Sequence, residues 1–197
     1  KPYRIGVAMC DTPAGHYKYI GDVNLPQDDR FMIFDPGVIN DNGRIYLAYG
    51  AGFGTSKTRT KVLGSAIVEL EDDMLTIKHE PKILVPNMLH SKGSGFEKHA
   101  FFEASSLRKF NDKYYFIYSS EVNHELCYAL SDNIDGPYIY KGILISNVDL
   151  GYKNNKTKFN CAGNNHGSIE KIKDDYYIFY HRQTQGTSFS RQACAEK

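Results

Sequence analysis

The chain repeats itself, and this feature constrains its fold more than any other. A polar residue, a short strand, a polar turn and a tyrosine-rich strand follow one another in residues 35–50, 103–118 and 166–180. The first residues of these copies, Asp35, Glu103 and His166, are 68 and 63 residues apart. Repeats at a nearly constant spacing are typical of folds built from copies of one supersecondary unit. We therefore expect an array of similar small sheets.

Each copy is predicted to form a β-hairpin. Asn42-Gly43 is a strong two-residue turn signal, because both residue types tolerate a positive φ. The corresponding turns of the later copies are predicted at Asn111-Asp112 and Asp174-Asp175. The second strands are rich in β-branched and aromatic residues, which favour strands, and are predicted at residues 45–49, 114–118 and 176–180. The composition agrees, with 15 Tyr and 11 Phe but no Trp.

A second strand–turn–strand phrase follows each hairpin, so the predicted unit has four strands. Four-stranded sheets repeated radially are the blades of a β-propeller, and this all-β fold is our prediction. The pieces are expected at about residues 3–26, 31–86, 99–147 and 159–197. No stretch shows sustained apolar periodicity of 3.6, so almost no helix is expected. A β-sandwich is the main competing fold, but it does not explain the repeat.

These pieces amount to part of a ring. Residues 1–197 would form one partial propeller domain, with half of one blade, two whole blades and part of another. A propeller needs about four blades or more to close, and an open ring leaves sheet edges unpaired. We therefore expect the remaining blades to lie on an upstream segment or on a second chain.

Charge and hydropathy exclude several kinds of partner. The chain has 24 Lys and Arg against 23 Asp and Glu, so its net charge of +1 indicates neither nucleic acid nor a membrane surface as a partner. No run of about 18 apolar residues exists, which rules out a transmembrane helix. The four cysteines form no C-x-x-C pair, and their disulfide state is left open. Secreted, periplasmic and cytoplasmic locations in a bacterium all stay open.

Two carboxyl groups and one imidazole open the repeats. The first strand of each propeller blade lines the central channel, so residues at the same place in each repeat meet around the axis. Asp35, Glu103 and His166 are such residues, and groups of this kind converging on one cavity suggest acid/base chemistry. One such residue alone would more simply cap a turn. Three in register favour a site.

Several motifs carry a resemblance to a known family. They are Phe34-Asp35-Pro36 with Asp41-Asn42-Gly43, residues 99–106, and Asn164-Asn165-His166-Gly167-Ser168 with Tyr180-His181-Arg182. In this combination, and in chain order, the sequence resembles glycoside hydrolase family 43 over essentially its whole length. The resemblance implies a five-bladed β-propeller, and an enzyme that inverts configuration at the anomeric carbon of arabinose or xylose units.

The resemblance also implies roles for three carboxylates. In the family, an Asp of the first blade is the general base, an Asp opening the third blade orients the acid and modulates its pKa, and a Glu opening the fourth blade is the general acid. By motif, Asp35 matches the modulator and Glu103 the acid. The chain would then contain the end of blade two, blades three and four, and part of blade five. No Asp here stands in the first-blade context, so the base is expected elsewhere.

These roles agree with the chemistry of inversion. An inverting glycosidase needs an acid for the leaving oxygen and a base to activate water, with the two carboxyl groups about 6.5–9.5 Å apart. The acid must stay protonated near neutral pH, and a neighbouring carboxylate favours this by disfavouring a second negative charge. Asp35 beside Glu103 would act in this way.

Four further residues are expected to contact substrate or metal. Phe34 and Phe102 flank the two carboxylates, and at least one phenylalanine of the group that includes Phe101 should form a sugar-facing platform while another packs between blades. The resemblance implies that His166 bonds the modulating carboxylate or holds a hydrated calcium ion in the channel through water. Arg182 is a candidate donor to sugar hydroxyls.

The sequence thus predicts an inverting hydrolase of arabinose- or xylose-containing units in plant hemicellulose or pectin, of the α-L-arabinofuranosidase or β-xylosidase type. Its partner would be an oligo- or polysaccharide. No cofactor is expected to be required, although a structural calcium ion in the channel stays open. An endo-arabinanase of the same family and a non-catalytic carbohydrate-binding propeller are the alternatives.

Overall fold

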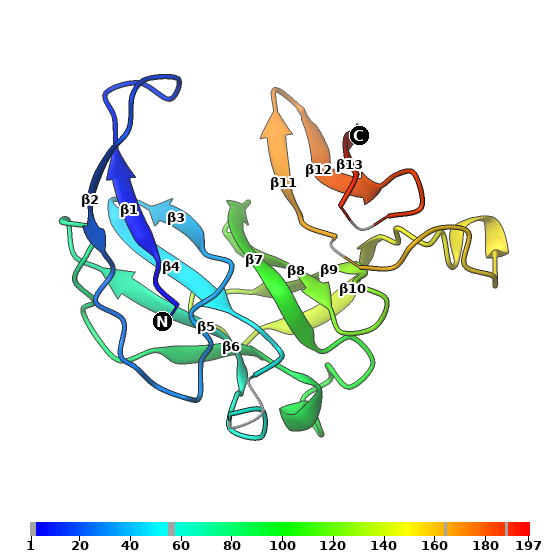
Figure 1. Cartoon of the computed structure of the whole chain (residues 1–197), viewed down its shortest axis with the longest axis horizontal. Coiled ribbons are helices and arrows are strands. Elements are labelled where there is room, and N and C mark those ends of the chain that lie inside the picture. Colours follow the sequence, from blue (N-terminus) through cyan, green and yellow to red (C-terminus); the bar gives the residue numbers. More distant parts are fainter. Residues whose placement is uncertain (1–2, 55–57, 164, 188) are drawn as a thin grey trace.

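The computed structural model describes residues 3–54, 58–163, 165–187 and 189–197. Over these residues the chain forms four antiparallel sheets, arranged side by side as sectors around a common centre (Figure 1). The only helices among them are two short 3-10 turns, η1 (Met88–His90) and η2 (Tyr152–Asn154). The prediction of an all-β, blade-like architecture with almost no helix is confirmed. Asn164, part of one sequence motif, lies outside the described residues.

The strands follow the chain in simple order within each sheet. The first sheet pairs β1 (Gly6–Met9) with β2 (Lys18–Asp22). The second has the order β3 (Gly37–Asp41), β4 (Arg44–Gly50), β5 (Gly64–Leu70) and β6 (Lys82–Pro86). The third has the order β7 (Phe101–Phe110), β8 (Lys113–Ser120), β9 (Leu126–Ser131) and β10 (Ile139–Ile145). The last has β11 (Gly167–Ile172), β12 (Asp175–Gln183) and β13 (Arg191–Glu196).

Two of the three tyrosine-rich strands, β4 and β8, are buried on both faces along most of their length. Side chains alternate along a strand, so neighbouring residues point to opposite sides of the sheet. In β4, Tyr46 and Ala48 join the core shared with the third sheet, whereas Leu47 and Tyr49 join the core shared with the first. The second and third sheets are therefore each held by two neighbours, and the repeat in the sequence becomes a repeat of packed layers.

Three apolar clusters fill the spaces between the four sheets. In β8, Phe116 and Tyr118 pack toward the second sheet, and Ile117 packs toward the last. The cluster between the last two sheets is small, and only Ile117, Leu126 and Tyr180 are buried in it. The last sheet is therefore held by less buried apolar area than the two sheets before it.

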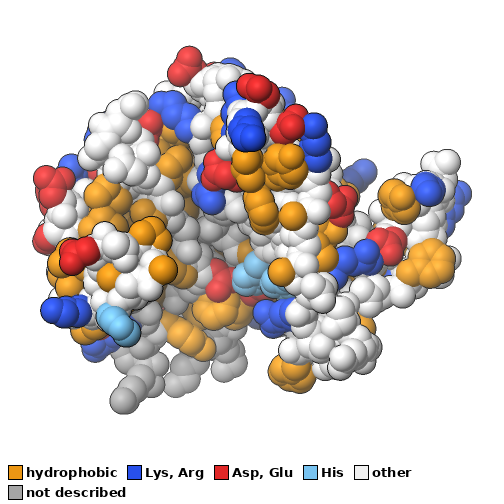
Figure 2. Space-filling model, turned by 90° about the horizontal axis from the view of Figure 1, so that it is seen from above, with side chains coloured by type: hydrophobic (Ala, Val, Ile, Leu, Met, Phe, Trp, Pro, Cys, Tyr) orange, Lys and Arg blue, Asp and Glu red, His pale blue; other side chains and the backbone are white. Residues whose placement is uncertain are grey.

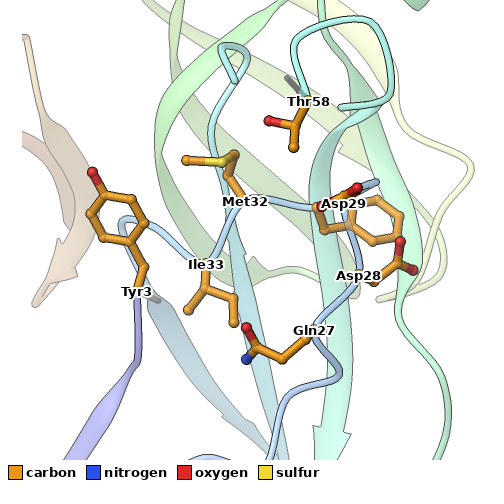
Figure 3. Close-up of a pocket in the computed structure, with 8 residues that line it drawn as sticks. Tyr3, Gln27, Asp28, Asp29, Met32, Ile33 and Thr58 are labelled. Atoms are coloured by element: carbon orange, nitrogen blue, oxygen red, sulfur yellow. The ribbon is translucent and has the colours of Figure 1, made fainter. Parts of the chain in front are cut away.

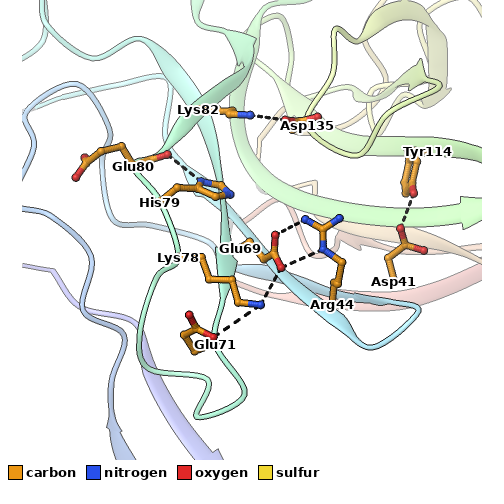
Figure 4. Close-up of polar contacts among 10 residues, drawn as sticks. All are labelled: Asp41, Arg44, Glu69, Glu71, Lys78, His79, Glu80, Lys82, Tyr114 and Asp135. Carbon is orange, nitrogen blue, oxygen red and sulfur yellow. Dashed lines mark hydrogen bonds and ion pairs between the residues drawn. The ribbon is translucent and has the colours of Figure 1, made fainter.

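Polar contacts join the second and third sheets at their outer rim (Figure 4). Asp41, at the end of β3, accepts hydrogen bonds from the hydroxyl of Tyr114 at 2.5 Å and from Nζ of Lys109 at 2.8 Å. Glu69 is buried on β5, where the Arg44 guanidinium and then the Lys78 ammonium lower the pKa of its carboxyl to about 2. The charges are thus paired within the described part of the rim, which marks a structural network.

Two of the three predicted hairpin turns have the expected residues. Asn42 and Gly43 adopt φ values of 54° and 86°, and Asn111 and Asp112 adopt 49° and 59°. The third prediction, Asp174-Asp175, is wrong by one residue. The turn is formed by Lys173-Asp174, with φ of 58° at Lys173, and Asp175 already pairs with Ile172 in the sheet. The register of aromatic side chains in β12 outweighs the turn preference of the aspartates.

The structure shows the state of the cysteines and the length and hydropathy of the described helices. Cys10, Cys127, Cys161 and Cys194 are all free thiols, and only Cys127 is buried. In the ranges that the structure describes, neither helix has the length and hydropathy to cross a membrane.

At Gly37 the backbones of the second and third sheets approach closely. A Cβ atom on Gly37 would lie 2.2 Å from the carbonyl oxygen of Ser105 in β7. We therefore expect Gly37→Ala to force β3 and β7 apart and to lower the melting temperature of the full-length protein strongly. The matched control is Gly43→Ala, because Gly43 has a positive φ but no atom within 4 Å of the added Cβ. It should cost only about 1 kcal/mol. Equal melting temperatures in the two variants would contradict this packing argument.

Candidate active site

The three sheets that carry the repeats bring their first polar residues together. Asp35 lies two residues before β3, Glu103 lies in β7, and His166 directly precedes β11. One ligand atom from each of these side chains lies within 4.8 Å of the others. Seen from above, histidine and acidic side chains gather near the centre of the molecule with hydrophobic side chains beside them (Figure 2). The predicted convergence of Asp35, Glu103 and His166 is confirmed, while their chemical roles stay predictions.

Irregular backbone aims the two carboxyl groups. The pairing of β7 with β8 shifts register on both sides of Glu103, between Phe101 and Glu103 and again before Ser106. Such bulges commonly redirect a side chain beside an active site. Asp35 and Ala104 also adopt positive φ values of 42° and 65°, and such strained backbone persists only where its surroundings hold it.

The contacts within the cluster are short. His166 Nε2 lies 3.1 Å from Glu103 Oε1 and 3.6 Å from Asp35 Oδ2. The backbone N–H of Ala104 donates to Asp35 Oδ2 at 3.2 Å. Glu103 is only 7% exposed, so it interacts mainly with these groups and little with bulk water. The His166 imidazole therefore lies close to both carboxyl groups and bridges them.

The distance between the carboxyl groups limits what they can do. Asp35 and Glu103 present oxygen atoms within 4.8 Å of each other. An inverting pair of acid and base needs about 6.5–9.5 Å to admit the attacking water. These two residues are therefore too close to be that pair, whereas the modulator role predicted for Asp35 requires such proximity.

Burial and mutual charge shift the protonation of the cluster. Burial raises the pKa of Asp35, and the neighbouring Glu103 carboxyl raises it further, against the opposing effects of His166 and the Ala104 N–H. Burial alone would lower the pKa of His166, but its hydrogen bond to Glu103 and the charge of Asp35 together raise that pKa above the ordinary value. The cluster thus favours a protonated imidazole between two carboxyl groups.

Aromatic side chains border the site on one side. Phe34 lies edge-on to Phe53 at 5.5 Å, and Phe53 lies 5.2 Å from Phe102. Tyr3 extends this row, with its ring centroid 6.1 Å from that of Phe34. Phe101 is instead fully buried between the sheets. The expectation that one phenylalanine packs between blades is confirmed, and Phe34 and Phe102 stay predictions as sugar platforms.

Arg182 does not join the cluster. Its guanidinium pairs with the Asp149 carboxylate at 3.0 Å and donates to the carbonyl of Asn147 at 3.2 Å. It lines a separate cavity of about 630 Å³ together with Tyr152 and Glu196. Its role as a donor to sugar hydroxyls stays a prediction, and Arg182 would have to act away from the carboxylates. The reason is strand alternation: its neighbour His181 faces His166, so Arg182 points to the other side of β12.

Four residues near the site were not predicted from the sequence. His124 Nδ1 lies 3.7 Å from Glu103 Oε1, and the His181 ring stacks on that of His166 at 5.6 Å. The positive charge of Arg191 acts against the protonation of His166, and Phe53 completes the aromatic row. His181 stands in the Tyr-His-Arg motif and was within reach of sequence reasoning. His124 and Phe53 lie in segments without a repeated pattern, and Arg191 opens the third strand of the last sheet, where no polar motif repeats.

The cluster does not fit direct binding of calcium. Calcium takes six to eight oxygen ligands. The group formed by Asp35, Glu103 and His166 offers two carboxyl groups and one nitrogen, and that nitrogen is already at hydrogen-bond distance from Glu103. Water would have to supply most of the ligands of a calcium ion at this site.

A cavity near the N-terminal end of the chain is a weaker candidate site (Figure 3). It has a volume of about 200 Å³ and is lined by Tyr3, Asp28 and Asp29 among others. Its two carboxylates are each paired, Asp28 with Arg30 at 2.6 Å and Asp29 with Lys61 at 2.9 Å. Paired, largely solvated charges are typical of a structural surface.

The link between Asp35 and His166 can be tested directly. We expect Asp35→Asn to lower the pKa of His166, because the charge that favours the imidazolium is removed. NMR titration of the histidine ring signals in the full-length protein measures this. Asp29→Asn is the control, since Asp29 pairs with Lys61 in a different cavity. A His166 pKa that is the same in Asp35→Asn as in the unaltered protein would refute the charge contact.

Comparison with known proteins places this geometry in a family. The whole chain, residues 1–197, matches the family described as glycosyl hydrolases family 43. A xylosidase/arabinosidase of Thermoclostridium stercorarium is 47% identical over 98% of this chain, and one of Bacteroides ovatus is 34% identical over 91%. The chain spans 42% and 56% of the lengths of these two relatives.

A solved structure has the same fold. It is a family 43 β-xylosidase/α-arabinofuranosidase from a compost microbial metagenome, in complex with xylotriose and in a calcium-free form. It aligns with a TM-score of 0.73 at 25% identity, over 98% of this chain and 61% of its own. The sheets described above are thus blades of the family's propeller, and the chain belongs to glycosyl hydrolase family 43.

Proposed function

We propose that this chain carries the general acid of an inverting glycoside hydrolase, with Glu103 as the acid and Asp35 as its modulator. The observation that carries the proposal is the buried Glu103 carboxyl, held 3.1 Å from His166 beside a second carboxyl group. General acid catalysis needs a carboxyl group held in a fixed position, and these contacts hold that of Glu103. Family membership supports the reaction class.

In the proposed reaction, Glu103 donates its proton to the glycosidic oxygen as the bond from that oxygen to the anomeric carbon breaks. A water molecule attacks the opposite face of the sugar and loses a proton to the general base. Asp35 lies too close to Glu103 to leave room for this water. The base therefore belongs to a part of the propeller outside these 197 residues, on an upstream segment or on a second chain.

The proposed substrates are arabinose- or xylose-containing oligo- and polysaccharides of plant hemicellulose or pectin. Relatives bear the names xylosidase/arabinosidase and arabinoxylan arabinofuranohydrolase, and one solved relative holds xylotriose. These names favour an α-L-arabinofuranosidase or β-xylosidase over the endo-arabinanase alternative. The aromatic row of Phe34, Phe53 and Phe102 offers apolar faces on which a sugar ring can stack.

The activity test uses the full-length protein and 4-nitrophenyl α-L-arabinofuranoside and β-xyloside. We expect Glu103→Gln to lower kcat/KM by about 10²–10⁴-fold, which is the usual contribution of general acid catalysis. Asp35→Asn should also lower it, because the acid loses its neighbour. Glu71→Gln is the control, since Glu71 lies on the outer rim (Figure 4) and is half exposed.

The outcomes separate the candidate functions. Turnover by Glu103→Gln equal to that of the unaltered protein would remove Glu103 from the acid role. Binding of xylo-oligosaccharide without any turnover would favour a carbohydrate-binding module. Cleavage of linear arabinan in mid-chain would favour the endo-arabinanase. NMR of the first-formed sugar anomer tests inversion.

We also propose that the reaction requires no metal ion. The acid, the modulator and the bridging imidazole already satisfy one another's charges, and their donor set does not suit calcium. Dialysis of the full-length protein against a chelator should therefore leave kcat unchanged. A loss of activity that calcium restores would contradict this proposal and would place a hydrated ion in the channel.

A further inference from the structure

Oε1 of Glu103 faces two imidazole rings from two different sheets. His166, ahead of β11, places Nε2 at 3.1 Å from this oxygen, and His124, between β8 and β9, places Nδ1 at 3.7 Å from it. His166 follows from the repeat of the sequence, whereas His124 does not. Its approach to the acid therefore needs a separate explanation.

The loop that carries His124 is tightly held. Asn123 and His124 adopt positive φ values of 57° and 50°. The N–H of Glu125 donates to the carbonyl of Val122 at 3.2 Å, and the hydroxyl of Ser120 donates to the same carbonyl at 3.0 Å. Positive φ values are uncommon outside glycine, and such backbone is concentrated at functional sites. The strain here sets the position of the His124 ring.

The ring itself is also fixed in orientation. It lies against the Phe102 ring, with centroids 4.5 Å apart and planes at 64°. Nδ1 is buried and makes no hydrogen bond to any described residue, so its nearest charged neighbour is the Glu103 carboxyl. Burial lowers the pKa of His124, against the opposing charge of Glu103, and the His166 charge lowers it further. A neutral imidazole thus turns a desolvated ring nitrogen toward the acid.

We propose that His124 is a second positioning residue for Glu103, which together with His166 engages Oε1 and leaves Oε2 to carry the catalytic proton. The inference rests on the proposed acid role of Glu103. Oε1 is at hydrogen-bond distance from His166 Nε2, and the His124 ring lies 3.7 Å from the same oxygen without a hydrogen bond, so Oε2 is the more open position for the acidic O–H. The proton then passes from Oε2 to the glycosidic oxygen as its bond to the anomeric carbon breaks, and Glu103 is left as a carboxylate.

Positioning of the acid has a kinetic signature that mere packing lacks. Protonation matters most for leaving groups that are poor without it, and least for leaving groups that depart as stable anions. A misplaced acid should therefore slow the hydrolysis of aryl glycosides whose leaving groups have a high pKa, and should leave the hydrolysis of dinitrophenyl glycosides nearly unchanged. A general loss of structure would slow all of them alike.

The test compares His124→Leu with His124→Asn in the full-length enzyme, on a series of aryl xylosides and arabinofuranosides. The Asn side chain returns an N–H donor close to the Nδ1 position and tolerates a positive φ, whereas Leu has no donor. We expect His124→Leu to lower kcat/KM about tenfold for phenyl glycosides and less than about twofold for dinitrophenyl glycosides, with His124→Asn near the unaltered enzyme. His16→Gln, on the exposed loop between β1 and β2, is the control.

Two results would overturn the proposal: an equal loss for every leaving group, or no rescue by Asn in a variant whose melting temperature matches that of the unaltered protein. An NMR titration needs no turnover and separates this proposal from the proposed function. The His124 ring pKa should fall in Glu103→Gln, because the carboxylate that raises it is gone. If no glycoside is hydrolysed, the function fails, but this shift still shows that the contact exists. An unchanged His124 titration would refute the contact itself.

Discussion

The packing of the second and third sheets against a neighbour on either side is the constraint on which the rest of this structure depends. The second strands of the repeats make it possible, because their alternate side chains enter two different cores. Tyr46 and Leu47 are adjacent in β4, yet they pack against different sheets. Once the sheets are stacked in this way, their first strands must converge, and Gly37 allows the backbones of β3 and β7 to come close enough.

The convergence of the first strands places two carboxyl groups close together, and a neighbouring side chain offsets the repulsion between them. The half-buried Asp35 and the buried Glu103 present oxygen atoms within 4.8 Å of each other, and two negative charges at that distance repel unless a counter-charge lies nearby. The imidazole of His166 supplies it, and its pKa is raised as a result. The strained φ values at Asp35 and Ala104 show that the surrounding sheets hold the carboxyl groups where an isolated strand would not.

The distance between the carboxyl groups of Asp35 and Glu103 also limits which pair of catalytic roles these two residues could have. A separation of this size suits an acid and its modulator and excludes an acid and a base with water between them. This agrees with the coverage of the relatives, since the chain spans 42% of one and 56% of another. The chain thus brings together three polar residues from three neighbouring sheets.

Much of the fold was predictable because it is periodic. The spacing of the copies, the turn at Asn42-Gly43 and the runs of tyrosine predict hairpins, blades and a propeller without any tertiary information. The turn at Lys173-Asp174 was missed by one residue, because local turn preference is weaker than the register that packing imposes on β12. The family resemblance was likewise available from motifs alone.

The sequence by itself determined the repeat, the strand order and the identity of the three polar residues that open the repeats. Only the tertiary structure decided which side of a strand each side chain faces and which loop reaches the site. It separated His181 from Arg182, which are adjacent in the chain but point to opposite faces of β12. It also placed His124 beside Glu103. Sequence periodicity follows from the geometry of strands and turns within one sheet, whereas contacts between loops of different sheets depend on how those sheets pack.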